Sequence, residues 1–355
     1  MTEHQNVKQS GWPPLPQIVL VLLVIGGLFW YSPKAGSSRF SASSQNLPSP
    51  VTVSVDNGEV IPLKGVKLPV QLGNLGPQLV ATGVIDKEKF LGLYTGNTTL
   101  TKEAERLLTA SNGEFVITQE NSPVVLNLLW ALGLGNKNPI LDSGEMTDPR
   151  YGGAGNFAST GGWTIAKGNA MEHYSKHGFI ALTPEQQALV DKVSRNIYRP
   201  CCGNSVHFPD CNHGMAMLGF LELMASQGAS EKDMYKAALA VNSYWFPDTY
   251  ITIAAYMKSK GTEWRNVEPQ IVLGAEYSSG QGFARIASQV TQSSHNGGGG
   301  GCGVGSSQAT PLGFSRTKYR QENLGGGQAP TPRQQGGCGV GEQTSVPQKQ
   351  SGCGV

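Results

Sequence analysis

Five side chains that can bind a soft metal ion or exchange disulfides fall within thirteen consecutive positions of this 355-residue sequence: Cys201, Cys202, His207, Cys211 and His213. Cysteine usually behaves as a small buried hydrophobic residue, which does not explain three thiols and two imidazoles in one short segment. Thiolates and imidazoles are the ligands of tetrahedral zinc and of cuprous copper. We therefore predict a metal site formed by Cys202, His207, Cys211 and His213, with Cys201 as an alternative ligand.

Two other uses of these thiols stay open from the sequence. A disulfide between Cys202 and Cys211, or between Cys201 and Cys211, would staple the loop in an oxidising compartment and make the segment structural. Cys211 also stands at the start of a predicted helix, whose positive end favours the thiolate that disulfide exchange needs. We first expect a metal-binding protein. If the protein is an enzyme, we expect a thiol–disulfide oxidoreductase that uses Cys202 and Cys211.

Three further thiols occur in a tail rich in Gly, Gln, Ser and Pro, residues 291–355. Cys302, Cys338 and Cys353 each begin a Cys-Gly-Val sequence, and the third copy ends the chain. This composition cannot bury a core, so the tail is predicted to be disordered. Mobile thiols of this kind suit delivery of a metal ion, or of electrons, to a fixed site.

The elements that must hold the cluster are predicted to be helices within residues 183–260. Thr183 begins a capping box, Thr-Pro-Glu-Gln, and the helix it opens should run to about Tyr198, before Pro200. A second helix starts near residue 212 and ends at Gly228, and Ser230 caps a third. A fourth helical stretch covers roughly 248–259. The cysteine segment is therefore expected to be a loop between two helices, with Met215 and Met217 in the core.

This order of elements resembles the CcmH-like thiol oxidoreductases of cytochrome c maturation. The similar stretch is about 183–247, and it includes Arg-Pro-Cys-Cys at 199–202 and Gln-Gly-Ala-Ser-Glu-Lys-Asp-Met-Tyr at 227–235. The resemblance implies a membrane-anchored three-helix domain that exchanges disulfides through Cys201 or Cys202. The family has a Cys-x-x-Cys pair at the end of its first helix, whereas this chain has adjacent cysteines, so the exchange partner would have to be Cys211.

The rest of the chain predicts a mainly α fold over residues 51–290. Alternating valines around Asp-Asn-Gly at 56–58 predict a small β-hairpin over 51–70. Residues 79–150 look helical, with a helix opened by Ser122 and Pro123 and stopped at Gly133. Residues 150–170 are predicted to be a structural loop packed by Trp163. Histidines 173 and 177 are expected to be solvated, with a second metal site as the other interpretation.

The N-terminal region predicts a membrane anchor. Residues 17–31 read QIVLVLLVIGGLFWY, an uncharged apolar run flanked by tryptophans, between a short segment, 1–16, and a Ser-rich linker, 32–50. A cleaved signal peptide is the competing interpretation, and the charges on the two sides are nearly balanced. We expect a single-pass membrane protein whose remaining domain is extracytoplasmic.

The composition and motifs of the sequence limit the classes of partner and of function that we expect. A net charge of +2 without a Lys/Arg block argues against nucleic acid, and no phosphate-binding glycine motif precedes a predicted helix. A cysteine hydrolase would need a third orienting residue, which the sequence does not offer. The prediction is therefore a membrane-anchored protein that binds and transfers copper or zinc, whose partners are the membrane and a metal donor or acceptor, or a thiol protein. The third possibility is a structural protein with a stapled loop.

Overall fold

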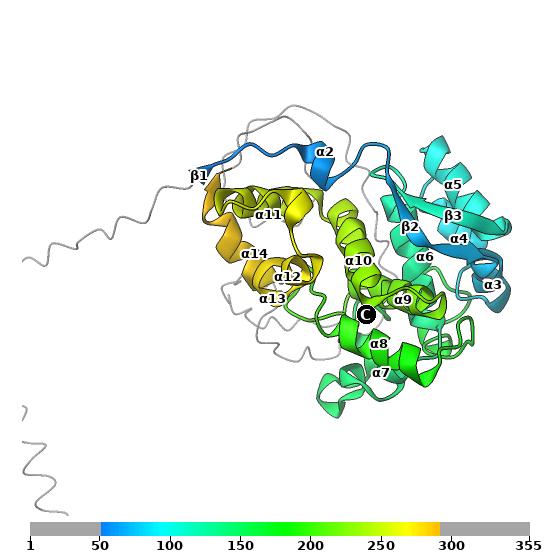
Figure 1. The fold of residues 1–355 in the computed structure, drawn as a ribbon. Helices are drawn as coiled ribbons and strands as arrows, with labels where there is room; N and C mark the ends of the chain where they lie inside the picture. Colours follow the sequence, from blue (N-terminus) through cyan, green and yellow to red (C-terminus); the bar gives the residue numbers. More distant parts are fainter. Residues whose placement is uncertain (1–50, 292–355) are drawn as a thin grey trace, which may run out of the picture. The chain divides into compact units, whose positions relative to one another are not determined.

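The computed structural model of this protein describes residues 51–291. The chain divides into two units, 1–49 and 50–355, and all described residues belong to the second. The fold is mainly helical, as predicted (Figure 1). Its α-helices are α2 (Asn57–Val60), α3 (Leu75–Thr82), α4 (Lys87–Gly92), α5 (Thr98–Thr109), α6 (Ser122–Gly135), α7 (Pro139–Ser143), α8 (Pro184–Ser194), α9 (Asn212–Ser226), α10 (Glu231–Trp245), α11 (Pro247–Ser259), α12 (Pro269–Leu273), α13 (Ala275–Ser278) and α14 (Gly280–Ala287).

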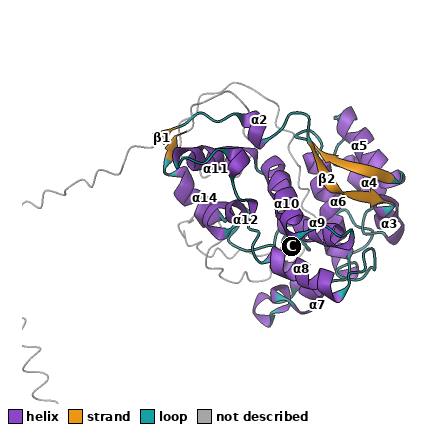
Figure 2. Cartoon of the chain, in the orientation of Figure 1, coloured by secondary structure: helices purple, strands orange, loops and turns teal. Residues whose placement is uncertain are grey.

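Four short strands form two small sheets (Figure 2). Strands β1 (Val51–Thr52) and β4 (Val290–Thr291) pair in parallel, and β2 (Val66–Gly73) pairs antiparallel with β3 (Asn112–Ile117). The hairpin predicted within 51–70 is therefore wrong. Asp56 does not begin a turn between two strands. Its side chain accepts a hydrogen bond from the backbone N–H of Gly58 and caps helix α2.

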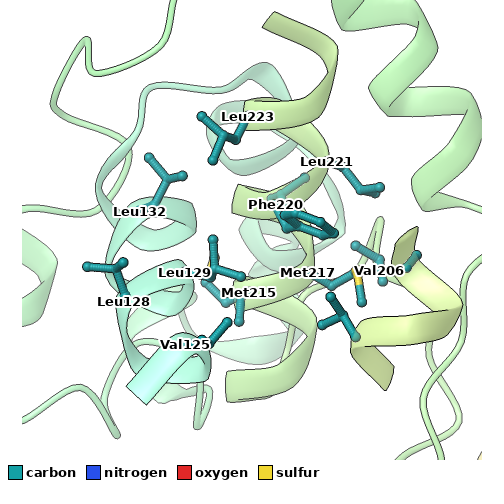
Figure 3. Close-up of a cluster of buried hydrophobic side chains, with 14 of the residues drawn as sticks. Val125, Leu128, Leu129, Leu132, Val206, Met215, Met217, Phe220, Leu221 and Leu223 are labelled. Atoms are coloured by element: carbon teal, nitrogen blue, oxygen red, sulfur yellow. The ribbon is translucent and has the colours of Figure 1, made fainter. Parts of the chain in front are cut away.

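Helices α6 and α9 pack against each other at the centre of the core (Figure 3). Gly133 does not stop α6, which continues to Gly135, because the helices touch at this glycine. A Cβ placed on Gly133 would lie 2.0 Å from the backbone oxygen of Met215. Both helices are surrounded by fully or almost fully buried apolar side chains, among them Val125, Leu128, Leu129, Leu132, Met215, Met217, Phe220, Leu221 and Leu223.

The helices around the cysteine segment begin where the sequence predicts. Thr183 and Gln186 make the capping box of α8, and the Ser230 hydroxyl accepts from the N–H of Asp233 at the start of α10. Helix α8 ends at Ser194, earlier than predicted. At Tyr198 the chain no longer follows a helical path, because the N–H of Tyr198 donates to the carbonyl of Leu273 and not to a carbonyl of α8. The chain has therefore left the helix before it reaches the cysteines.

The segment 150–170 is packed by Trp163, as expected. Trp163 is buried, its Nε1 donates to the carbonyl of Val84 at 2.8 Å, and its ring packs edge-on against Trp130 at 4.8 Å between centroids. His173 and His177 are not two solvated residues. His173 is buried, its Nδ1 lies 3.1 Å from Nε2 of His177, and its Nε2 lies 2.8 Å from the carbonyl of Lys167.

The predicted single-pass membrane architecture needs correction. Within residues 51–291, every helix is too short or too polar to span a bilayer. The anchor predicted at 17–31 lies outside the described residues, as do the linker at 32–50 and the cysteine tail. A single-pass membrane protein with an extracytoplasmic domain is therefore not supported by the structure.

Candidate functional site

The two adjacent cysteines lie in a turn that follows α8 and is fixed by backbone hydrogen bonds. The N–H of Cys202 donates to the carbonyl of Arg199 at 3.3 Å, and the N–H of Gly280, the first residue of α14, donates to the carbonyl of Cys202 at 2.8 Å. Pro200 removes a donor from the turn and prevents α8 from continuing through it. Cys201 and Cys202 are half-buried, so solvent still reaches this part of the surface.

Cys211 and His213 lie at the start of α9 and face Cys201. Cys211 is the N-cap residue, and His213 lies in the first helical turn. The Sγ of Cys201 is 3.5 Å from the Sγ of Cys211 and 4.0 Å from Nδ1 of His213. The His213 ring packs against Phe246 and Trp245, with centroids 4.4 and 5.7 Å away. These aromatic contacts orient the imidazole toward the thiols.

Arg199 is the central residue that the sequence prediction missed. Its side chain is only 1% exposed, yet it carries a full charge. Nε donates to the Sγ of Cys211 at 3.2 Å, one terminal nitrogen donates to the carbonyl of Asn204 at 2.9 Å, and the other donates to the carbonyl of Phe208 at 3.0 Å and pairs with the Asp210 carboxylate. The guanidinium therefore holds both ends of the cysteine loop together.

Gly214 makes room for this arginine. A Cβ at position 214 would lie 2.5 Å from a terminal nitrogen of Arg199, so a larger residue in the first turn of α9 would displace the guanidinium. The glycine that ends Cys-Asn-His-Gly is a sequence signal for close approach of another group, but the sequence alone does not say which group approaches. The arginine directly before Pro-Cys-Cys could have been flagged as a thiolate partner.

Cys202 belongs to a second group of side chains around Cys211. Its Sγ is 3.8 Å from Oδ1 of Asp210 and 4.0 Å from the carbonyl of Asn204. Asp210 is already engaged, because one oxygen pairs with Arg199 and the other accepts from Nδ2 of Asn204 at 2.8 Å. The cluster thus contains two overlapping groups of potential ligands, Cys201–Cys211–His213 and Cys202–Asp210–Cys211, which share the sulfur of Cys211.

The three thiols differ in acidity because they hydrogen-bond to one another. Hydrogen bonds from Cys201 and Cys202, and then the charge of Arg199, hold the pKa of Cys211 well below its usual range against the effect of burial. The pKa of Cys201 is raised by its hydrogen bonds to Cys202 and Cys211 and by burial. For Cys202, a hydrogen bond with Cys201 lowers the pKa, but the bond with Cys211 and burial outweigh it and raise the pKa to about 12. Cys211 is therefore the most acidic thiol of the cluster.

His207, a predicted ligand, is placed outside both groups. Its Nε2 lies 2.8 Å from Oδ1 of Asp191 on α8, and its Nδ1 lies 3.7 Å from Oε1 of Glu145. The side chain is buried at a cavity of about 600 Å³ that is also lined by Arg195. The residue lies midway along the cysteine loop in sequence, but the loop turns its imidazole toward α8, away from the thiols.

The three described cysteines are free, so neither of the two alternative disulfides, Cys202–Cys211 or Cys201–Cys211, is formed in this structure. The sulfurs of Cys201 and Cys211 lie 3.5 Å apart, in contact but not bonded. The tail thiols Cys302, Cys338 and Cys353 lie outside the described residues. Met215 and Met217 are core residues of α9, as predicted, and belong to the cluster of buried hydrophobic side chains shown in Figure 3.

The group Cys201, Cys211 and His213 is close enough to hold a metal ion, with all three ligand atoms within 4.8 Å of one another. Bonds of about 2.3 Å to sulfur and about 2.1 Å to nitrogen, at tetrahedral angles, separate two sulfurs by about 3.8 Å and a sulfur from a nitrogen by about 3.6 Å. The observed sulfur–sulfur distance of 3.5 Å is slightly shorter than this geometry, and the observed sulfur–nitrogen distance of 4.0 Å is slightly longer. Small side-chain adjustments would therefore bring the three atoms onto one ion.

Comparisons with known proteins do not identify the chain. No protein family matches it, and neither a curated protein nor a solved structure shows significant similarity. The resemblance of residues 183–247 to CcmH-like oxidoreductases therefore stays a hypothesis. The function has to be argued from the geometry of the cluster.

Proposed function

We propose that this protein binds and transfers a soft metal ion through Cys201, Cys211 and His213. The supporting observation is the convergence of these three side chains from two separate segments, with 3.5 Å between the sulfurs and 4.0 Å from Cys201 to the imidazole. A disulfide staple would require only the two sulfurs. An aromatic-packed histidine whose Nδ1 is directed at a thiol adds the third ligand of a sulfur–nitrogen metal site.

The formal charges of the cluster favour a divalent ion. Arg199 and Asp210 cancel each other, and ligation converts Cys201 and Cys211 to two thiolates. One Zn²⁺ then brings the buried cluster to neutrality, whereas one cuprous ion leaves a net negative charge. Burying net charge is costly, so zinc is the ion we assign and cuprous copper is the competitor in the test.

Arg199 would act on the ion only through its neighbours. Its Nε–H donates to the Cys211 sulfur, and a hydrogen bond of this kind orients a thiolate and moderates its charge. Because the guanidinium also binds the carbonyls of Asn204 and Phe208, it fixes the loop that separates the two cysteine-bearing segments. Preorganisation of this type lowers the entropic cost of closing three ligands around one ion.

Three protein ligands leave one tetrahedral position open, which is the arrangement of zinc sites that exchange a fourth ligand. The tail supplies chemically suitable fourth ligands, because Cys302, Cys338 and Cys353 recur in the same Cys-Gly-Val sequence. We include these thiols in the proposal as donors or acceptors of the ion, alongside a partner protein that carries a comparable thiol.

The test is elemental analysis of the full-length chain, purified anaerobically and reconstituted with Zn²⁺ or with cuprous ion. Cysteines 302, 338 and 353 are replaced by serine, so that the cluster alone supplies thiols. We expect one zinc per chain, retained on gel filtration, and loss of that zinc in Cys201→Ser. A chain that holds neither ion after reconstitution would refute the proposal.

A second candidate function is supported by the acidity of Cys211 and its distance to Cys201. The Cys211 thiolate would attack a disulfide of a partner protein, Cys201 would resolve the mixed disulfide, and the partner would leave as a dithiol with the Cys201–Cys211 disulfide formed. A thiol reductant would then have to reduce that disulfide. The metal-free sample tests this function: disulfide exchange that is lost in both Cys201→Ser and Cys211→Ser would favour it over metal binding.

A further inference from the structure

The cluster offers a metal ion two positions rather than one. Both potential ligand groups contain Cys211, and they differ in whether Cys201 and His213 or Cys202 and Asp210 complete them. Since the shared sulfur can stay bound while the other ligands are exchanged, an ion could move between the two positions without being released. This inference rests on the proposed function of metal binding and concerns the path of the ion.

The two positions are unequal in strength. In the first position, the Cys201 sulfur and the His213 Nδ1 contact each other or Cys211, and these contacts are weaker than an ion pair. In the second, the Asp210 carboxylate is already occupied on both oxygens, by Arg199 and by Asn204. Binding an ion there would require Asp210 to give up charged and neutral hydrogen bonds while largely buried, which costs free energy.

Cys202 is nevertheless well placed for the first contact. Outside the thiol cluster, its sulfur makes only the weak contacts at 3.8 and 4.0 Å, and its remaining partners are the thiols of Cys201 and Cys211. Its backbone is fixed by the hydrogen bond from Gly280. It is half-buried, so an incoming ion can reach it. A thiol that solvent reaches, whose backbone is fixed and whose contacts outside the cluster are weak is suited to fast ligand exchange more than to retention.

We propose that Cys202 and Cys211 form a transit position through which the ion reaches the retention position made by Cys201, Cys211 and His213. In the step, a bond forms between zinc and the Cys202 sulfur while a bond between zinc and its donor breaks, and the Cys202 proton passes to solvent. Cys201 then displaces Cys202 from the ion, the Cys201 proton passes to the released Cys202 thiolate, and His213 completes the site as a neutral imidazole. The ion keeps its charge, and no oxidant or reductant is needed.

The experiment compares adjacent serine variants in the full-length chain that carries serine at the three tail positions. A chromogenic zinc chelator serves as the donor, and both the equilibrium affinity and the rate of zinc uptake are measured. For Cys202→Ser we expect an almost unchanged affinity and uptake slowed by about tenfold, the lower end of the cost of removing one partner from a metal site. Cys201→Ser should weaken the affinity by more than about 100-fold, because it removes a direct ligand.

Circular dichroism checks that each variant is folded, and Cys202→Ala serves as a second replacement if serine disturbs the turn. An affinity that falls in Cys202→Ser as far as in Cys201→Ser would make Cys202 a permanent ligand and overturn the inference while leaving the proposed function standing. An uptake rate unchanged in both Cys202 variants would overturn it as well. If the parent chain binds no zinc, the proposed function fails and the transit position with it.

Discussion

His207 and His213 lie six positions apart in one loop and helix start, but their imidazoles meet different neighbours. His213 packs on Phe246 and directs Nδ1 at the sulfur of Cys201, whereas His207 binds the carboxylate of Asp191. At the scale of the residue, the two therefore differ in role. One is a candidate ligand, and the other ties the loop to α8.

A matched pair of substitutions tests this difference. We expect His213→Gln to weaken zinc binding by more than about tenfold, because it removes the only nitrogen ligand of the retention group. His207→Gln should leave zinc binding nearly unchanged and lower the free energy of unfolding by about 1 kcal/mol, through loss of the bond to Asp191. Competition with a zinc chelator and urea denaturation are the measurements. Equal losses of affinity in the two variants would contradict the assignment of His213 as the ligand.

At the scale of the element, the crossing of α6 and α9 determines where the cluster's second half lies. Gly133 on α6 and Gly219 on α9 let the two backbones touch, and a Cβ on Gly219 would lie 2.6 Å from the backbone nitrogen of Gly133 and 2.7 Å from the carbonyl of Leu129. Cys211 and His213 begin the same helix that Gly219 anchors. The glycine contact therefore fixes α9, the helix that begins with Cys211 and His213, against α6.

Gly219→Ala is expected to destabilise the protein despite the better helix propensity of alanine. The added methyl group overlaps backbone atoms that cannot move away without separating the helices, which costs about 1–3 kcal/mol or more. Gly113→Ala, in β3, is the control, since nothing lies within 4 Å of its new Cβ, and it should stay within about 0.5 kcal/mol. Urea denaturation of both variants measures this. A Gly219→Ala variant as stable as the control would show that the interface can spread at no cost.

At the scale of the whole molecule, one buried carboxyl connects several segments. Glu222 on α9 is fully buried and accepts hydrogen bonds from the side chains of Asn136 at 2.8 Å and Asn138 at 2.5 Å. Asn136 in turn accepts from the N–H of Ile180, and Asn138 accepts from Gln187 on α8. The end of α6, the start of α7, the segment before α8 and α9 itself therefore meet at this carboxyl.

Burial raises the pKa of Glu222 from 4.5 to about 8, although the two asparagines act against the shift. Between these values the folded state holds a proton that the unfolded state releases, so stability falls as the pH rises from about 5 to about 8. We expect this group to contribute a loss of roughly 3 kcal/mol over that range. Glu222→Gln should flatten the dependence, whatever its constant effect on stability.

The measurement is urea denaturation of the full-length chain in steps from pH 5 to pH 8. Gly219→Ala provides the control for destabilisation as such, because it weakens the same helix but keeps the carboxyl, and it should retain the slope of the wild-type protein. Parallel pH profiles for the wild-type protein and Glu222→Gln would show that the carboxyl does not hold its proton in the folded state.

Local signals in the sequence determined where several elements begin. The capping box at Thr183 and the cap at Ser230 are satisfied by backbone groups a few residues away, so short-range chemistry is enough to predict them. The helical character of the chain and the helix that carries Met215 and Met217 follow from the same kind of pattern. The concentration of thiols also identified the right segment for a candidate site.

Tertiary structure decided which of those residues meet. The loop turns His207 toward α8, the turn after α8 brings Cys201 rather than Cys202 beside His213, and Arg199 enters the cluster because Gly214 leaves space for its guanidinium. Strand β2 likewise pairs with β3, nearly forty residues beyond it in the sequence, and not within a local hairpin. Such outcomes depend on long-range packing of α6 against α9 and on the satisfaction of a buried charge, and no spacing of residues along a chain encodes either one directly.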